Sequence, residues 1–314
     1  MNRDVFVIRG QSQKGEVFLI SNNNIFEGAA TALVTPFSDG VIDFASLGRI
    51  IDFQIDEGIS ALVVCGTTGE VSTLSISERK KMIEFTVERC NGRVPVIAGT
   101  GGNNTQTAAE MSVFARDAGA DAILSVAPYY NKGTRTGIIE HYRTIAQRSK
   151  LPVIVYNVPS RTGVNLTSEI YKELSEIQGI AGIKEAGGNL EKCLKTAALT
   201  QGRMTLYSGN DADTLPIISL GGKGVISVAS NIVPKRISDM CRAALLGDRG
   251  GALGICLECA ELFETLFMEV NPVPVKYAMS KLGFCKNELR LPLTVCEEKT
   301  AAVVDKVLSK LALV

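Results

Sequence analysis

One lysine in this sequence stands inside an apolar run, and its chemistry is the most specific that the chain offers. Lys184 lies within Ile-Ala-Gly-Ile-Lys-Glu-Ala at 180–186, which has the pattern of a buried strand. Lysine is rarely buried without a partner, and burial lowers the pKa of its ammonium group. A neutral amine can attack a carbonyl carbon and form an iminium. The alternative at this point is a Lys184 that faces outward or pairs with a carboxylate.

Iminium chemistry needs a proton carrier, and Tyr156 is the candidate for that role. Its ordinary pKa is about 10, so neighbouring hydroxyls must relay the proton, and Thr67 and Tyr130 could supply them. Taken alone, a tyrosine such as Tyr156 is more often a core aromatic residue whose hydroxyl has a hydrogen-bond partner. The single histidine, His141, excludes a histidine-rich metal site and is expected on a helix surface.

Two further groups have the chemistry to hold carboxylates. Gly-Thr-Thr-Gly-Glu at 66–70 offers hydroxyls and backbone amides that form a nest for an anion. Arg161 adds a forked donor for a second carboxylate. A lone loop arginine is more often simply solvated, so this role stays a hypothesis.

Eight short apolar runs alternate with amphipathic segments and would position these groups. The segments carry helix caps such as Asp43 and the capping box of Ser75 and Glu78. The pattern predicts an α/β fold, a (β/α)8 TIM barrel whose active site lies at the C-terminal ends of its strands. A doubly wound sheet is the alternative, but no G-x-G-x-x-G series follows a strand. The predicted strands are residues 30–35, 61–65, 94–99, 122–127, 152–157, 180–185, 204–208 and 224–228.

The chain is predicted to have three parts. Residues 1–24 are read as an extension outside the fold, residues 25–250 as the barrel, and residues 251–314 as a C-terminal helical extension. The glycine-rich run at 221–224 looks like a phosphate loop. It precedes the last strand, however, and so belongs to the opposite end of the barrel from the active site.

Charge and cysteine content exclude several classes of function. Lys plus Arg and Asp plus Glu are equal at 33 each, so no basic field exists to hold a nucleic acid or a membrane surface. No apolar run approaches the ~20 residues of a membrane span. The eight cysteines are scattered, which favours reduced thiols and a cytoplasmic protein. We expect no metal and no cofactor.

Several ordered motifs together resemble the dihydrodipicolinate synthase family, within the superfamily of N-acetylneuraminate lyase and other Schiff-base aldolases. The resemblance runs from about residue 25 to the C-terminus. It rests on residues 66–70, on Pro-Tyr-Tyr-Asn at 128–131, and on Tyr-Asn-Val-Pro-Ser-Arg-Thr-Gly at 156–163. Residues 182–186, Gly-Val-Ile-Ser at 224–227 and Asn-Pro-Val-Pro-Val-Lys at 271–276 complete it.

The resemblance implies a lyase that condenses pyruvate with L-aspartate 4-semialdehyde, giving 4-hydroxy-tetrahydrodipicolinate in lysine and diaminopimelate biosynthesis. Lys184 would form the Schiff base and Tyr156 would be the central acid and base. Thr67 would relay protons to Tyr130 of a neighbouring subunit. The implied assembly is a homotetramer made of two tight dimers. The implied substrate-binding residues are Thr68 for the pyruvate carboxylate, Arg161 for the semialdehyde carboxylate, and Gly209 and Ile226 as pocket lining.

Two other functions stay open. A sibling aldolase or lyase acting on N-acetylneuraminate or a 2-keto-3-deoxy sugar acid would share Lys184 and Tyr156, whereas the Thr67-Thr68 pair with Arg161 favours the synthase. A catalytically silent barrel with a binding role would retain all of these residues by accident. A metal-dependent aldolase is disfavoured by the single histidine.

The resemblance also points to a candidate effector site at Asn103 and Tyr129, where lysine-inhibited relatives bind lysine. Thr107 stands where sensitive members place a glutamate, and Ile76 and Arg79 replace histidines found in some of them. Without that glutamate the effector's ammonium loses a charged partner worth roughly 1.5–3 kcal/mol. We therefore predict weak or absent inhibition by lysine.

Overall fold

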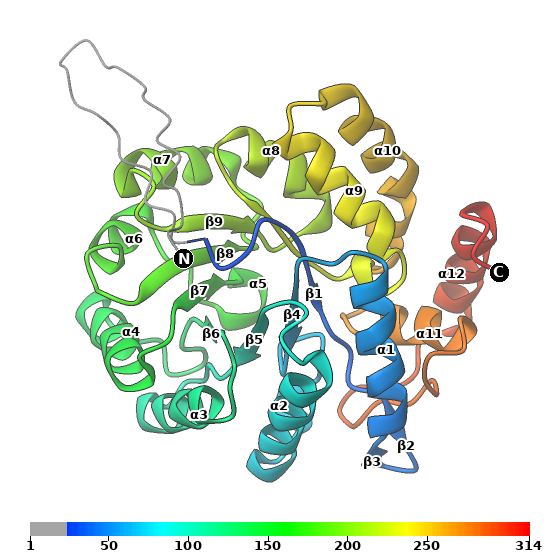
Figure 1. Cartoon of the computed structure of the whole chain (residues 1–314), viewed down its shortest axis with the longest axis horizontal. Coiled ribbons are helices and arrows are strands. Elements are labelled where there is room, and N and C mark those ends of the chain that lie inside the picture. The colour runs from blue at the N-terminus through cyan, green and yellow to red at the C-terminus, as the bar shows by residue number, and fades with distance from the viewer. Residues whose placement is uncertain (1–23) are drawn as a thin grey trace.

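The chain folds as a closed barrel of eight parallel strands. The computed structural model describes residues 24–314, so the predicted role of residues 1–23 lies outside the described residues. The strands follow one another around the barrel in the order β1-β10-β9-β8-β7-β6-β5-β4, and β1 pairs with β4 to close it (Figure 1). The barrel strands are β1 (Gly28–Ala32), β4 (Ala61–Val64), β5 (Val96–Gly99), β6 (Ala122–Val126), β7 (Val153–Asn157), β8 (Ile180–Glu185), β9 (Thr205–Ser208) and β10 (Gly224–Ser227).

Helices surround this barrel and continue beyond its last strand. The predicted TIM barrel with C-terminal helices is confirmed. The α-helices are α1 (Phe44–Asp56), α2 (Ile76–Cys90), α3 (Thr105–Asp117), α4 (Arg135–Ser149), α5 (Pro159–Thr162), α6 (Ser168–Leu174), α7 (Leu190–Thr200), α8 (Thr214–Ser219), α9 (Pro234–Leu245), α10 (Arg249–Thr265), α11 (Val273–Lys281) and α12 (Glu298–Lys310). Short 3-10 turns are η1 (Val71–Thr73), η2 (Asp211–Asp213) and η3 (Ala229–Asn231).

Local sequence explains where the first helices begin. The side chain of Asp43 accepts a hydrogen bond from the backbone amide of Ser46 and caps α1. Ser75 and Glu78 form the predicted capping box of α2, with each side chain bonded to the other's backbone amide. Such caps satisfy amides that a helix start leaves without partners.

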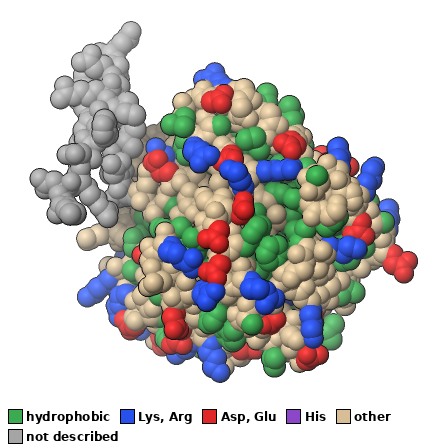
Figure 2. All heavy atoms as spheres, turned by 45° about the vertical axis from the view of Figure 1, so that its right-hand side comes forward, with side chains coloured by type: hydrophobic (Ala, Val, Ile, Leu, Met, Phe, Trp, Pro, Cys, Tyr) green, Lys and Arg blue, Asp and Glu red, His purple; other side chains and the backbone are tan. Residues whose placement is uncertain are grey.

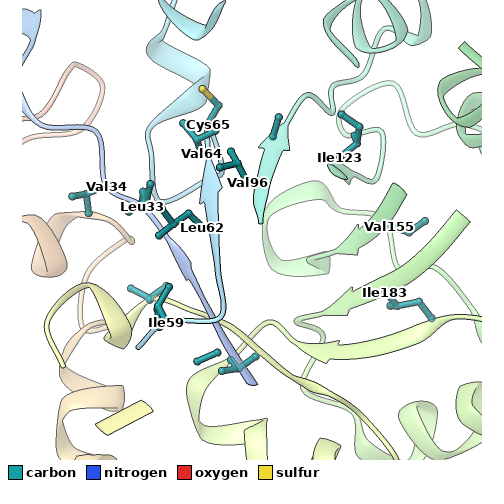
Figure 3. Packing of buried hydrophobic residues seen from close by; sticks show 14 of the residues in the cluster. Leu33, Val34, Ile59, Leu62, Val64, Cys65, Val96, Ile123, Val155 and Ile183 are labelled. Atoms are coloured by element: carbon teal, nitrogen blue, oxygen red, sulfur yellow. The ribbon is translucent and has the colours of Figure 1, made fainter. Parts of the chain in front are cut away.

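Apolar side chains fill two separate layers. Figure 3 shows the larger one, between the strands and the helices, with Val155 and Ile183 projecting from neighbouring strands. A smaller cluster inside the barrel contains Ile154, Tyr156 and Ile226. Because side chains alternate along a strand, β8 sends Ile183 outward and Lys184 inward.

The glycine-rich run at 221–224 has a structural role at the base of the barrel. A Cβ atom on Gly224 would lie 1.7 Å from the carbonyl oxygen of Gly28, and Gly224 has φ of 145°. Only glycine permits this approach of β10 to β1. The run lies before β10, at the end of the barrel opposite the active site, as predicted.

The C-terminal helices lie together on one side of the barrel, next to α1 and α9 (Figure 1). After α11 the chain returns to the small hairpin of β2 (Phe37–Ser38) and β3 (Val41–Ile42), where Glu288 accepts bonds from the amides of Asp39 and Gly40. The division of the chain at residue 250 stays a prediction. Basic and acidic side chains are interspersed over the face shown in Figure 2.

One expectation is wrong: His141 is not a helix-surface residue. It is 4% exposed, and its Nδ1 lies 2.9 Å from the Thr105 hydroxyl of α3. Helices α3 and α4 pack closely enough to enclose it. Burial lowers the pKa of His141 to about 4. Among the residues that the structure describes, no helix is long and apolar enough to cross a membrane.

Candidate active site

Lys184 points into the barrel, and the alternative of an outward-facing lysine is therefore wrong. Its side chain is 5% exposed, and Nζ lies 4.4 Å from the centre of the Tyr156 ring. Burial lowers the pKa of Lys184 to about 8, the charge of Asp211 opposes this, and the charge of Arg161 adds to it. At pH 7 roughly a tenth of the amine is then neutral and nucleophilic, against less than about a thousandth at the ordinary pKa of 10.5.

Tyr156 lies opposite Lys184 on the adjacent strand β7. Burial raises the pKa of its phenol, while the charge of Arg161 and a side-chain hydrogen bond with Thr67 lower it. The phenol therefore carries its proton at neutral pH and has a hydroxyl partner with which to exchange it. This is the arrangement that proton transfer to and from a carbinolamine requires.

The loop after β4 places both threonines at the same end of the barrel. Thr67 and Thr68 line one cavity with Lys184 and Tyr156. Thr68 is buried, and its hydroxyl accepts a hydrogen bond of 3.0 Å from the side-chain amide of Asn271. The loop thus presents hydroxyl groups to the space above Lys184.

That space is a cavity of about 720 Å³. Arg161, which follows β7, lies in its wall, and its Nη2 donates a 2.8 Å hydrogen bond to the backbone oxygen of Asn271. The segment at 267–271, between α10 and α11, forms another wall. The cavity is large enough for two small carbonyl compounds, and its wall offers the Thr68 hydroxyl and the Arg161 guanidinium as groups that could receive their carboxylates.

The predicted pocket residues occupy different places. Gly209 lines the cavity, where a Cβ atom would lie 2.7 Å from that of Ala186. Ile226 is fully buried in the apolar cluster inside the barrel, and Val228 of the same chain segment lies in the cavity wall. Of the two residues predicted to line the pocket, Gly209 is therefore in the cavity wall, and Ile226 lies below it in the apolar cluster.

Tyr130 does not join the other predicted catalytic residues within one chain. It is 89% exposed and has φ of 68°. Tyr129 is 39% exposed, and the backbone oxygen of Asn103 accepts a hydrogen bond from the side chain of Asn131. Asn103, on the loop between β5 and α3, therefore contacts the loop that carries Tyr129 and Tyr130.

Sequence reasoning missed Asp211, whose buried carboxylate raises the pKa of Lys184. It accepts hydrogen bonds from the Ser227 hydroxyl and from the amides of Val228 (3.1 Å) and Ala229 (3.0 Å). Burial raises the pKa of Asp211, and these hydrogen bonds and the charge of Lys184 oppose the rise. An acid directly after strand β9 was the available signal, but its partners lie on another loop.

Sequence reasoning also missed Glu185, which fixes β8 on the side of the strand that faces the helices. Glu185 is buried and accepts bonds from the side-chain amide of Asn157 (2.8 Å), the Tyr171 hydroxyl (3.0 Å) and the Lys192 ammonium (2.9 Å). These contacts join β7, β8, α6 and α7 around the residue next to Lys184. The network fixes the end of the strand that carries the amine.

Comparisons with known proteins agree with this geometry. Residues 25–311 match the model of the dihydrodipicolinate synthetase family. The chain is 52% identical over 274 residues to the 4-hydroxy-tetrahydrodipicolinate synthase of Alkaliphilus oremlandii, covering 87% of this chain and 94% of that protein.

Two solved structures are similar over nearly the whole chain. The crystal structure of dihydrodipicolinate synthase from Aquifex aeolicus has a TM-score of 0.90 and 44% identity, with 92% of this chain and 99% of that chain covered. The chloride-inhibited dihydrodipicolinate synthase from Acinetobacter baumannii, in complex with pyruvate, has a TM-score of 0.90 and 40% identity. That match covers 92% of this chain and 99% of the other.

Proposed function

Because the chain belongs to the dihydrodipicolinate synthetase family, we propose that it condenses pyruvate with L-aspartate 4-semialdehyde through a Schiff base on Lys184. Its activity is that of a 4-hydroxy-tetrahydrodipicolinate synthase, a lyase, as the full-length similarity to such enzymes shows. The observation that carries the chemistry is the buried Lys184 amine facing Tyr156 inside the cavity.

The first step forms the covalent intermediate. The neutral amine of Lys184 attacks the keto carbon of pyruvate, whose carboxylate is held at Thr68. Tyr156 moves protons between the nitrogen and the former keto oxygen, which leaves as water, and the product is an iminium. The lowered pKa of Lys184 supports this step because the ammonium form has no lone pair to donate.

The second step joins the two substrates. Loss of a proton from the pyruvate methyl group gives an enamine, which attacks the aldehyde carbon of aspartate semialdehyde, held through its carboxylate by Arg161. The aldehyde oxygen becomes the 4-hydroxyl. The substrate's own amine then attacks the iminium carbon and displaces the Lys184 amine. One water is released in total, and the ring closes as 4-hydroxy-tetrahydrodipicolinate.

We further propose that the working form is a homotetramer built from two tight dimers. The position of Tyr130 supports the dimer, because its side chain is exposed and does not line the cavity of its own chain that contains Thr67. In a dimer, Tyr130 would enter the partner's site and complete the relay through Thr67 to Tyr156. Cytoplasmic location and independence of metals and cofactors stay predictions.

A coupled assay tests the reaction. Pyruvate, aspartate semialdehyde, excess dihydrodipicolinate reductase and NADPH should give rapid NADPH oxidation, unchanged by a chelator and lost in Lys184→Ala. Borohydride with pyruvate should leave a reduced pyruvate adduct on Lys184, identified by peptide mass. An adduct without NADPH oxidation would move the function to a sibling aldolase or lyase, and no adduct would support the binding barrel.

Weak or absent inhibition by lysine also stays a prediction. At the candidate effector site, Ile76 is exposed and Thr107 brings no charge. Arg79 is partly buried, and burial lowers the pKa of its guanidinium. A guanidinium at this place repels the effector's ammonium groups. Half-inhibition at sub-millimolar lysine would contradict the prediction.

A further inference from the structure

Asn271 contacts both groups that the proposed function assigns to substrate carboxylates. Its side-chain Nδ2 donates to the Thr68 hydroxyl oxygen at 3.0 Å, and its backbone oxygen accepts from Arg161 Nη2 at 2.8 Å. Asn271 is 5% exposed and lines the cavity between these two residues. It comes from the segment that precedes α11, far along the chain from both partners.

The contact with Thr68 determines what that hydroxyl can still do. A threonine hydroxyl has one proton to donate and two lone pairs to accept with. Nδ2 of Asn271 donates to one lone pair of the Thr68 hydroxyl. Among residues 24–314, no group accepts the proton of that hydroxyl. The proton therefore remains available to a ligand in the cavity, and a carboxylate is the acceptor that gains most from it.

We propose that Asn271 is a positioning residue that presents the Thr68 hydroxyl as a donor to the carboxylate of the keto acid. This inference rests on the proposed function, since it concerns the same site. The side-chain Oδ1 of Asn271 has no hydrogen-bond partner among the described residues although it is buried. Among the described residues, the one hydrogen bond of this side chain is therefore the bond that Nδ2 donates to Thr68.

A second contact from the segment at 271–276 holds the loop that carries Thr68. Lys276 Nζ lies 2.7 Å from Glu70 Oε1, and both side chains are fully buried. The segment at 271–276 thus fastens residues 68 and 70 together. Changing the side chain of Asn271 should therefore alter the hydroxyl of Thr68 without releasing the whole loop.

The contact with Arg161 is made by the backbone, so side-chain substitutions leave it in place. Substitutions at Asn271 can therefore change the binding of pyruvate without changing the contact that holds Arg161 for the second substrate. Changes at Asn271 should raise the KM for pyruvate, while the KM for aspartate semialdehyde stays within about twofold, because loss of one neutral hydrogen bond is a small effect. A general loss of structure would raise both constants and lower kcat together.

The critical variant is Asn271→Asp, which keeps the shape and removes the donor. The new carboxylate would accept the Thr68 proton and repel the substrate carboxylate. We expect the pyruvate KM to rise by about tenfold or more, the size expected for a charged hydrogen bond. Asn271→Ala should raise it only about threefold, since the hydroxyl is then free to rotate. Asn287→Asp is the matched control, because Asn287 also has an unpaired Oδ1 and does not line the cavity.

These measurements use the full chain, with pyruvate KM, semialdehyde KM, kcat and Tm recorded for each variant. A pyruvate KM in Asn271→Asp equal to that of the wild type overturns the proposal, because Thr68 would already donate to residue 271. So does an Asn271→Ala variant that is more impaired than Asn271→Asp. If Asn271→Asp does not fold, Asn271→Ala takes its place. The proposal is then overturned if Asn271→Ala and the wild type need the same pyruvate concentration for half-maximal trapping by borohydride.

A double variant shows whether Asn271 acts through Thr68. Thr68→Val with Asn271→Ala should bind pyruvate no worse than Thr68→Val alone, and fully additive losses contradict the mechanism. Failure of the proposed function looks different, since the wild-type enzyme would then give no NADPH oxidation in the coupled assay, whether or not pyruvate is trapped on Lys184.

Discussion

Lys184 and Glu185 are adjacent on β8, yet their surroundings give them opposite roles. Glu185 faces the helices and is surrounded by donors, including the Lys192 ammonium, so its charge is stabilised. Lys184 faces the barrel interior, where burial disfavours its charge and lowers its pKa. A step of one residue along the strand therefore separates a structural anion from a nucleophilic amine.

The pH dependence of imine formation should follow the titration of Lys184. Its folded-state pKa of about 8 lies below the ordinary value of 10.5. The rate of pyruvate trapping by borohydride should rise with pH up to about 8 and then level off, because only the neutral amine attacks. The same shift means that the cost of burying the ammonium is present below about pH 8 and disappears as the pH rises towards 10.5.

Arg161→Met provides the control for this assignment. The charge of Arg161 lowers the pKa of Lys184, so its removal should move the midpoint to higher pH. Pyruvate trapping does not require the second substrate, and Arg161 can be replaced without removing the reacting groups. An unchanged midpoint in Arg161→Met would show that another group controls the profile.

Much of the site could be predicted from types and positions alone. Lys184, Tyr156, Thr67 and Thr68 all stand in or directly after apolar runs, and such positions face the active end of a barrel. Asn271 could not be found in this way, because its partner Thr68 lies 203 residues away in sequence. The motif at 271–276 marked Asn271 as part of the family resemblance, but nothing in that motif indicates which residue the side chain contacts.

At the scale of elements, a buried ion pair connects the loop after β4 to α11. Lys276 and Glu70 lie 2.7 Å apart with both side chains fully buried, and the second oxygen of Glu70 accepts from the amide of Arg290. Lys276 also lies over the Phe37 ring at 4.2 Å. The pair thus fastens the C-terminal helices to the edge of the active site.

Removing one member of this pair should be far worse than removing both. Lys276→Met should lower the free energy of unfolding by about 3–5 kcal/mol, because it leaves the Glu70 charge buried without a partner. The double variant Glu70→Gln/Lys276→Met should recover most of that loss. Urea unfolding of the wild type, Lys276→Met, Glu70→Gln and the double variant measures the effect, and simple addition of the two single-variant losses would contradict it.

The order of elements was predictable because each barrel strand is an apolar run between capped helices. All eight predicted strands occur, although β1 begins two residues earlier than expected, at Gly28. The β2–β3 hairpin was not foreseen, since strands of two residues carry no periodic signal. The position of His141 was wrong because the packing of α3 on α4, and not helix pattern alone, determines its burial.

At the scale of the whole molecule, the proposed assembly makes Tyr130 a residue of the neighbouring site. Mixing two inactive variants tests this. Hybrids of Lys184→Ala with Tyr130→Phe should regain activity, because one site in each hybrid dimer would receive an intact Lys184 and the partner's intact Tyr130. Steady-state NADPH oxidation after subunit exchange measures the recovery.

The matched control is a mixture of Lys184→Ala with Tyr156→Phe. Both residues face one cavity of the same chain, so no hybrid site contains the intact pair and no activity should return. Recovery in both mixtures, or in neither, would contradict a Tyr130 that acts across the dimer interface.

The wall formed by residues 267–271 has a consequence for how this scaffold can acquire new substrates. The reacting groups stand on barrel strands and the loop after β4, whereas this wall is a single short stretch between α10 and α11. A graft of residues 267–270 from another aldolase, with Asn271 kept for its contact with Thr68, would reshape the space around the second substrate while the amine and the phenol keep their places. Related enzymes could therefore accept different aldehydes through changes in this one linker, while the Schiff-base chemistry on Lys184 stays the same.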